Sequence, residues 1–168
     1  FQNNFFSRIN VIPEREVQDN RKTLYDIHVQ KLDFFPDSLA VFDALYKNNP
    51  YVIWLDSNKI VDGFSRFSYI GGSSGPLFHL IKYDLKLKRL EIHENGEVVY
   101  QNESIFDFLN REIKSRAAQV EGLPFQFIGG YAGYLGYELK SEYTADSNVH
   151  ESENPDAYFM FLDRLIVF

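Results

Sequence analysis

Cysteine is absent from this sequence of 168 residues, which excludes disulfide bonds, thiolate metal sites and a cysteine nucleophile. Long apolar runs are missing too, since none approaches the roughly 20 residues that a membrane-spanning helix needs. The amino terminus has no signal-peptide layout. Positive charge is scarce, because 17 Lys and Arg against 24 Asp and Glu leave a formal net charge of −7. We therefore expect neither a membrane nor a nucleic acid as a partner, since no basic surface would offset phosphate charge.

Residue patterns typical of catalytic or metal-binding sites are also few. No two of the four histidines have the spacing of a helical zinc pair, so a metal site is not expected at His28, His79, His93 or His150. The turn Ser73-Ser74-Gly75 lacks the glycine-x-serine-x-glycine pattern of a nucleophile elbow. The carboxylates between positions 141 and 156 are typical of a solvated loop. From its residues alone, the chain is predicted not to be a self-sufficient catalyst.

Aromatic rings are what the sequence has in quantity, with 16 Phe and 11 Tyr. Several of them alternate with glycines in the stretch LPFQFIGGYAGYLGYEL, from Leu123 to Leu139. Its glycine spacing matches neither a P-loop nor a dinucleotide-binding loop, so a phosphate site is not favoured. Two interpretations stay open. The stretch either crosses the core and lines a pocket, or it is a glycine-bearing strand packed tightly in the core.

Hydrophobic alternation and short apolar runs predict mainly strands. An alternating pattern indicates a half-buried strand over 24–33, and the continuous apolar run 51–56 is typical of a central strand. Asn95-Gly96 is the strongest hairpin signal, because a type I′ turn needs a positive φ at both positions. Further strands are predicted at 64–71, on both sides of Asn95-Gly96 and at 158–168.

Two amphipathic helices are also predicted. Asp37 can cap the first, over 38–47, and Ser104 with Asp107 forms a capping-box-like pair at the start of the second, over 104–119. The side chains expected to face inward are Leu39, Phe42, Leu45 and Tyr46 in the first helix and Ile105, Phe108, Leu109 and Ile113 in the second. A polar loop is expected over 141–154.

Strands outnumber helices and their connections are short, so the predicted fold class is α+β, a mainly antiparallel sheet or sandwich with helices packed on one side. The length fits one domain. We assign that domain to residues 23–168 and an arm or linker to residues 1–22. The sequence begins at Phe1 rather than Met and stops at Phe168 within what looks like an unfinished strand. We therefore expect a piece of a longer polypeptide.

Four motifs gain meaning when they are taken together: WLDS (54–57), SRFSYIGG (65–72), PFQFIGGYAGYLGYEL (124–139) and LDR (162–164). Their combination resembles the amino-terminal domain of component I of the chorismate-utilising enzymes, the family of anthranilate synthase and aminodeoxychorismate synthase. The match runs from about Val29 to the end of the chain. WLDS and RFSYIGG are closer to aminodeoxychorismate synthase, because anthranilate synthases more often have Leu-Leu-Glu-Ser at the first motif and tyrosine at the position of Phe67.

The resemblance implies an enzyme of the aminotransferase class. It would convert chorismate and glutamine-derived ammonia to 4-amino-4-deoxychorismate, for p-aminobenzoate and folate biosynthesis. It also implies Mg²⁺ as cofactor of the full-length enzyme, a glutaminase subunit or fused glutaminase domain, and a carboxy-terminal chorismate-binding domain that carries the catalytic residues. No catalytic residue, cofactor or metal is therefore expected in this chain, which would be inactive alone. The implied location is the cytoplasm, or a plastid in a plant.

The same resemblance implies that the domain contributes to a pocket for tryptophan, with the candidate ligand-binding residues Leu55, Ser57, Phe64, Ser65, Arg66 and Phe67. An amino-acid ligand needs acceptors for its ammonium, a donor for its carboxylate and an apolar slot for its ring. Ser57 could serve the ammonium and Arg66 the carboxylate. Arg66 could equally pair with Asp56 or Asp62, and the phenylalanines could be slot walls or core. Asp56 stands where feedback-sensitive enzymes carry glutamate, so a pocket need not mean regulation by tryptophan.

Three alternatives accompany this reading. The chain could be the amino-terminal domain of anthranilate synthase component I, with a tryptophan feedback site. It could be a stand-alone module that binds an aromatic amino acid. In the third alternative the domain is purely structural and its glycines serve packing alone.

Overall fold

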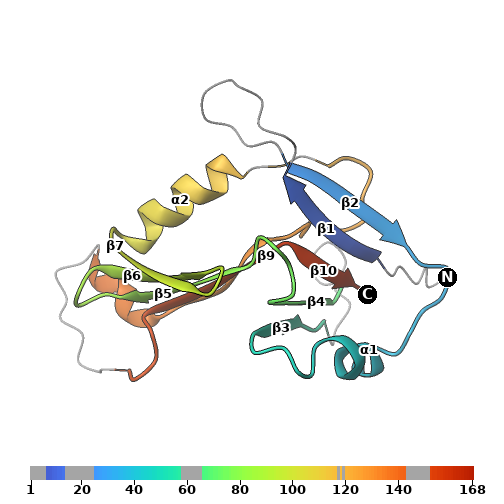
Figure 1. Ribbon diagram of the computed structural model, residues 1–168, viewed down its shortest axis with the longest axis horizontal. Coiled ribbons are helices and arrows are strands. Elements are labelled where there is room, and N and C mark those ends of the chain that lie inside the picture. The colour runs from blue at the N-terminus through green and yellow to red at the C-terminus, as the bar shows by residue number, and fades with distance from the viewer. Residues whose placement is uncertain (1–6, 14–24, 58–65, 117, 119, 143–151) are drawn as a thin grey trace.

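The described residues form two antiparallel sheets of five strands each in the computed structural model (Figure 1). These residues are 7–13, 25–57, 66–116, 118, 120–142 and 152–168. The first sheet has the strand order β2-β1-β10-β4-β3. Its strands are β1 (Ser7–Pro13), β2 (Tyr25–Lys31), β3 (Val52–Leu55), β4 (Tyr69–Gly72) and β10 (Arg164–Val167). The predicted α+β class with mainly antiparallel pairing is confirmed.

The second sheet has the strand order β7-β6-β5-β9-β8. Its strands are β5 (His79–Asp84), β6 (Arg89–Glu94), β7 (Glu97–Asn102), β8 (Gly130–Leu135) and β9 (Ala157–Leu162). The turn between β6 and β7 is the predicted hairpin, since Asn95 has a φ of 52° and Gly96 a φ of 81°. Only a turn that tolerates positive φ joins two strands this tightly with the right twist.

One stretch of chain belongs to both sheets, because β9 continues directly into β10 (Figure 1). Asp163 alone separates the two strands. A buried cluster gathers at this joint and contains Leu80, Phe125, Ala132, Met160, Leu162, Leu165 and Val167. The core that holds the two sheets together is therefore built around the last twelve residues, 157–168.

Helix α1 (Ser38–Leu45) packs on the first sheet. The Asp37 carboxylate accepts a hydrogen bond from the backbone N–H of Ala40 at 2.9 Å, so the predicted cap is confirmed. Phe42 stacks on Trp54 of β3 with 5.4 Å between ring centroids. The buried side chain at the end of the helix is Tyr46, which packs with two residues of the sheet, Ile70 and Ile166.

Leu39 and Leu45 of α1 do not face inward as predicted, since each is 58% exposed. A helix of eight residues meets the sheet along one narrow stripe, and Phe42 and Tyr46 occupy that stripe. The apolar spacing of the sequence therefore overstated how much of this helix is covered.

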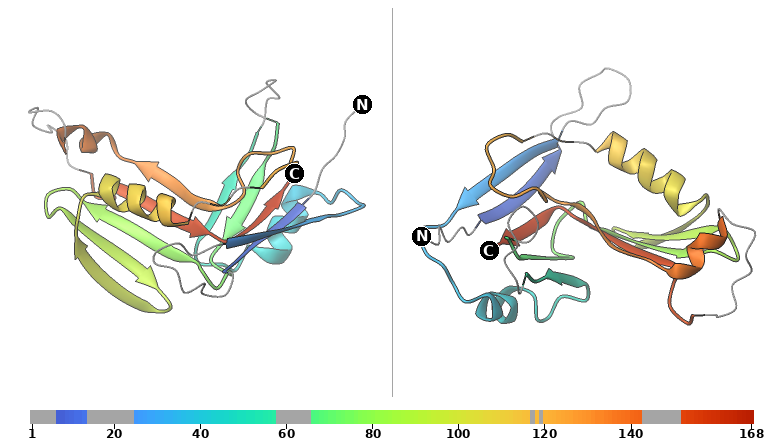
Figure 2. Two further views of the ribbon diagram at one scale, coloured as in Figure 1. Left: turned by 90° about the horizontal axis from the view of Figure 1, so that it is seen from above. Right: turned by 180° about the vertical axis from the view of Figure 1, so that it is seen from behind.

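Helix α2 (Ile105–Ser115) lies over the second sheet (Figure 2). Its predicted cap is confirmed, because the Ser104 hydroxyl accepts a hydrogen bond from the backbone N–H of Phe106 at 3.2 Å. Ile105 and Phe108 are buried, as predicted. Ile113 is 55% exposed instead, because the last turn of the helix rises away from the second sheet toward β2. No helix in the described ranges is long and apolar enough to cross a membrane.

Two strand predictions need correction or extension. The run 51–56 forms β3, which is an edge strand and not a central one. Its apolar pattern is continuous because Trp54 packs against α1 while Ile53 packs against the main core. Residues 7–13 of the predicted arm form β1, which pairs with both β2 and β10.

The glycine-rich stretch contains β8 and the start of the 3-10 helix η1 (Tyr137–Glu142). A Cβ atom on Gly133 would lie 1.9 Å from the backbone oxygen of Tyr158, so the backbones of β8 and β9 approach closely there. Residues 127–131, just before and at the start of β8, line a pocket. Both open interpretations thus describe part of the stretch: its beginning lines a pocket and its middle is tightly packed.

Candidate functional site

The WLDS and RFSYIGG motifs meet where β3 ends and β4 begins. These strands are antiparallel with Leu55 opposite Tyr69, so the residues just beyond β3 lie beside those just before β4. The Ser57 hydroxyl donates a hydrogen bond to the backbone oxygen of Phe67 at 2.9 Å, and the Ser57 N–H donates to Ser68 Oγ at 3.0 Å. Ser68 Oγ in turn donates to Asp56 Oδ1 at 2.9 Å. The two motifs are therefore bonded to each other.

The predicted ligand-binding residues lie in different environments around this junction. Leu55 is 44% exposed, and Arg66 is exposed with its Cζ 5.8 Å from the centre of the Phe67 ring. Phe67 is half-buried and meets Phe125 of the core edge-on at 5.8 Å. Phe64 and Ser65, like the possible partner Asp62, lie outside the described residues. Leu55, Ser57, Arg66 and Phe67 thus share one region of the first sheet.

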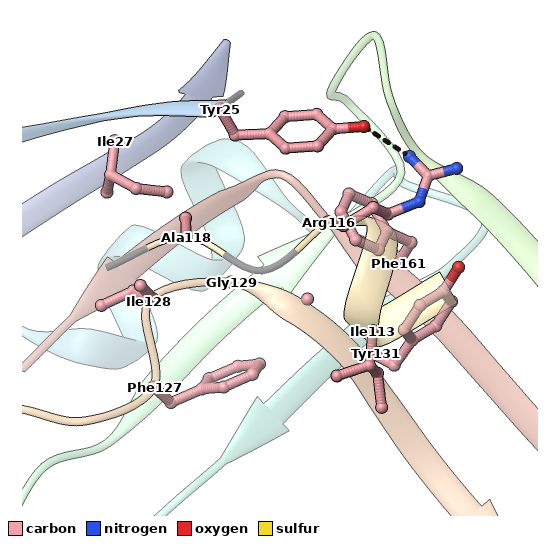
Figure 3. Close-up of a pocket in the computed structure, with 11 residues that line it drawn as sticks. Tyr25, Ile27, Ile113, Arg116, Ala118, Phe127, Ile128, Gly129, Tyr131 and Phe161 are labelled. Carbon is pink, nitrogen blue, oxygen red and sulfur yellow. Dashed lines mark hydrogen bonds between the residues drawn. The ribbon is translucent and has the colours of Figure 1, made fainter. Parts of the chain in front are cut away.

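A separate pocket of about 300 Å³ opens between β2, the end of α2 and the segment 127–131 (Figure 3). Its lining is mostly apolar and consists of Tyr25, Ile27, Ile113, Arg116, Ala118, Phe127, Ile128, Gly129, Gly130, Tyr131 and Phe161. None of the predicted ligand-binding residues is among them. Sequence reasoning placed the glycine-rich stretch at a pocket but did not identify the residues opposite it.

Arg116 supplies the charge of this pocket. Its Nε donates to the Glu112 carboxylate at 3.0 Å, and its Nη1 donates to the Tyr25 hydroxyl at 3.2 Å. The guanidinium also lies over the ring of Phe161, 5.0 Å from the ring centre. The i,i+4 spacing of Glu112 and Arg116 at the end of α2 is the signal in the sequence that could have found this residue.

A buried histidine lies behind the pocket wall. His79 is 3% exposed, stacks on Phe161 at 5.1 Å, and its Nε2 is 2.7 Å from the Tyr131 hydroxyl. Its Nδ1 faces the carbonyl oxygen of Leu77, which can only accept, so Nδ1 carries the proton and Nε2 accepts from Tyr131. Burial lowers the pKa of His79 and raises the pKa of Tyr131. Both groups are therefore neutral at pH 7 and act structurally.

Comparison with known proteins adds to this geometry. No protein-family model matches the chain. The chain is 38% identical over 143 residues to the aminodeoxychorismate synthase of Streptomyces pristinaespiralis, covering 84% of this chain and 20% of that protein. It is 35% identical over 156 residues to a probable chloroplastic aminodeoxychorismate synthase of Oryza sativa subsp. japonica, covering 82% and 17%. It is 32% identical over 131 residues to the aminodeoxychorismate synthase of Streptomyces griseus, covering 78% and 18%.

The share of each relative that the match covers indicates the class of protein. The chain spans a fifth or less of the length of the curated relatives it matches, so it is similar to one segment of a larger enzyme with other parts beyond the match. Those relatives share one name, and the chain is homologous to a segment of the aminodeoxychorismate synthases. The resemblance carried by the four motifs is thereby confirmed.

Proposed function

We propose that this chain is the amino-terminal, non-catalytic domain of an aminodeoxychorismate synthase component I. The observation that carries the proposal is 38% identity over 143 residues to a protein of that name. The complete enzyme would convert chorismate and glutamine-derived ammonia to 4-amino-4-deoxychorismate. Its partners would be a carboxy-terminal chorismate-binding domain and a glutaminase subunit or fused glutaminase domain, and its location would be the cytoplasm or a plastid.

The domain contributes structure rather than chemistry to this reaction. No group of three or more His, Cys, Asp or Glu in the described part of the chain could hold a metal ion. The described residues therefore do not fit the Mg²⁺ that the complete enzyme would use, and we assign no step of the reaction to them. In this proposal the isolated chain is inactive.

The first prediction concerns the product of the complete polypeptide that contains this chain. Supplied with chorismate, Mg²⁺ and glutamine, it is expected to form aminodeoxychorismate, which chromatography separates from anthranilate. The isolated chain under the same conditions serves as the control and is expected to form neither. Accumulation of anthranilate would overturn the assignment in favour of an anthranilate synthase component I.

We further propose that the junction of the WLDS and RFSYIGG motifs contributes to a pocket for an aromatic amino acid. In this proposal Leu55, Ser57, Arg66 and Phe67 act together with Phe64 and Ser65. The hydrogen bond from Ser57 to the Phe67 backbone holds the two motifs at a fixed separation. The Arg66 side chain is exposed, so its guanidinium can bind a ligand carboxylate without first being uncovered.

The second prediction follows from this arrangement. Titration calorimetry of the chain with tryptophan is expected to show binding, and Arg66→Ala is expected to weaken it by about tenfold through loss of a charge-assisted hydrogen bond. Ser57→Ala should also weaken it by releasing the junction. Ser73→Ala is the matched control, because the Ser73 hydroxyl donates to Asn49 at 3.2 Å and lies beyond the end of β4 that is opposite to the junction. Absence of heat at millimolar tryptophan would argue against this pocket.

A further inference from the structure

Among the described residues, the pocket beside Arg116 has a single charged lining residue, and that residue is a cation. Glu112 pairs with Arg116 Nε at 3.0 Å and with Arg111 Nε at 3.4 Å, so its carboxylate is shared between two guanidinium groups. Glu112 itself is not among the residues that line the pocket. Arg116 itself is only 23% exposed. A half-buried guanidinium facing an apolar cavity favours an anion, because little solvent competes for its donors.

Two hydroxyl groups stand next to this guanidinium. Tyr25 accepts from Arg116 Nη1 at 3.2 Å and so keeps its own proton for another acceptor. Figure 3 shows Tyr25 and Tyr131 on either side of Arg116, with the rest of the lining apolar. The polar groups thus gather at one end of the pocket, as in a site that fixes the head of a mostly apolar ligand.

The opposite wall is made of one ring and bare backbone. Phe127 contributes the ring, while Gly129 and Gly130 expose backbone without side chains. A second ring, that of Phe161, lies under the Arg116 guanidinium at the polar end. Both glycines have a positive φ, 114° and 112°, and an added Cβ on Gly130 would meet no atom within 4 Å. Open space over a glycine backbone next to aromatic walls suits a flat ring.

We propose that this pocket binds a compact aromatic monocarboxylate. Its carboxylate accepts hydrogen bonds from Arg116 and Tyr25, and its ring lies against the backbone of Gly129 and Gly130. An aromatic α-amino acid is disfavoured here, because the described lining residues offer no carboxylate for its ammonium. The proposal uses none of the residues of the WLDS and RFSYIGG junction and does not depend on the chorismate reaction.

Benzoate is the probe that tests this site, and benzamide is its neutral counterpart of the same shape. Titration of the 15N-labelled chain with benzoate is expected to shift the backbone amide signals of Gly129 and Gly130. Arg116→Met is expected to weaken benzoate binding by at least about tenfold, since a hydrogen bond to a charged group is lost. Arg89→Met is the matched control: Arg89 of β6 also lies over a ring, that of Tyr100 at 4.8 Å, but Tyr100 belongs to β7, the edge strand farthest from β8.

A second variant keeps the test decisive if Arg116→Met fails to fold. Ile113 is 55% exposed and lines the pocket, so Ile113→Trp should fold normally and abolish benzoate binding by filling the space. Equal affinity for benzoate and benzamide, or unchanged binding in both pocket variants, would overturn the proposal. Benzoate-induced shifts at Ser57 and Phe67 instead of the two glycines would also overturn it and assign the anion to the motif junction. The product assay is unaffected by any of these outcomes, so the two proposals fail separately.

Discussion

Gly133→Ala is expected to destabilise the protein by about 3 kcal/mol or more. The added Cβ would lie 1.9 Å from the backbone oxygen of Tyr158 and 2.8 Å from the Cα of Phe159. These are backbone atoms of β9, so no side-chain rotation relieves the overlap, and β8 has to separate from β9. For a chain of this size, thermal unfolding followed by circular dichroism should show a midpoint lower by roughly 6 to 12 °C.

The matched control for this substitution is Gly122→Ala. Gly122 has a φ of 80° but no atom within 4 Å of an added Cβ, so alanine there introduces backbone strain without overlap. The expected loss is about 1–2 kcal/mol. If Gly133→Ala unfolds at the temperature of the unmodified protein, β8 and β9 are not in the close contact that the structure shows.

Gly75→Ala is expected to be similarly destabilising, and Asp163→Ala is expected to compensate part of the loss. A Cβ on Gly75 would lie 1.6 Å from Oδ1 and 2.2 Å from Cγ of Asp163. Asp163 is 1% exposed and its Oδ2 accepts from the Leu77 N–H at 2.9 Å, so the carboxylate has no free direction in which to move. Truncating Asp163 to alanine removes the three atoms that lie nearest to the new Cβ.

The double-mutant cycle measures this coupling in urea unfolding at pH 7. Asp163→Ala alone leaves the Leu77 N–H without its acceptor, at a cost of about 1–3 kcal/mol. Burial raises the pKa of the Asp163 carboxyl, so the carboxylate charge is disfavoured in the folded protein. Removing that charge offsets part of the cost of the lost hydrogen bond. The double variant should be at least about 1 kcal/mol more stable than the sum of the single effects predicts. Simple additivity would contradict the contact between Gly75 and Asp163.

Local chemistry explains why some elements could be predicted from the sequence. The β6–β7 hairpin follows from Asn95-Gly96, because few other residue pairs adopt two consecutive positive φ angles. Both helix starts follow from a side-chain acceptor next to unpaired N–H groups, supplied by Asp37 and Ser104. These signals act over two to four residues, and no distant part of the chain is needed to complete them.

Predictions that depended on distant neighbours were less successful. The apolar run of β3 suggested a central strand, yet the strand lies at a sheet edge, because α1 and the core cover its two faces in place of flanking strands. Leu39 and Leu45 have helical spacing, but only the position of α1 on the sheet decides that both are exposed. Periodicity indicates which face of a helix or strand is apolar, but it does not indicate which other element covers that face.

The sequence by itself determined the class of fold and the family resemblance of four motifs, and it limited the glycine-rich stretch to a pocket wall or a tightly packed strand. These depend on composition, on short-range backbone preferences and on the absence of Cβ atoms, all of which are local properties. Only the tertiary structure decided that Tyr25, Arg116 and Phe127 share a pocket, since they come from β2, the end of α2 and the segment before β8. Their meeting requires the β9–β10 stretch to join two sheets, and that long-range pairing is encoded by the whole core rather than by any one motif.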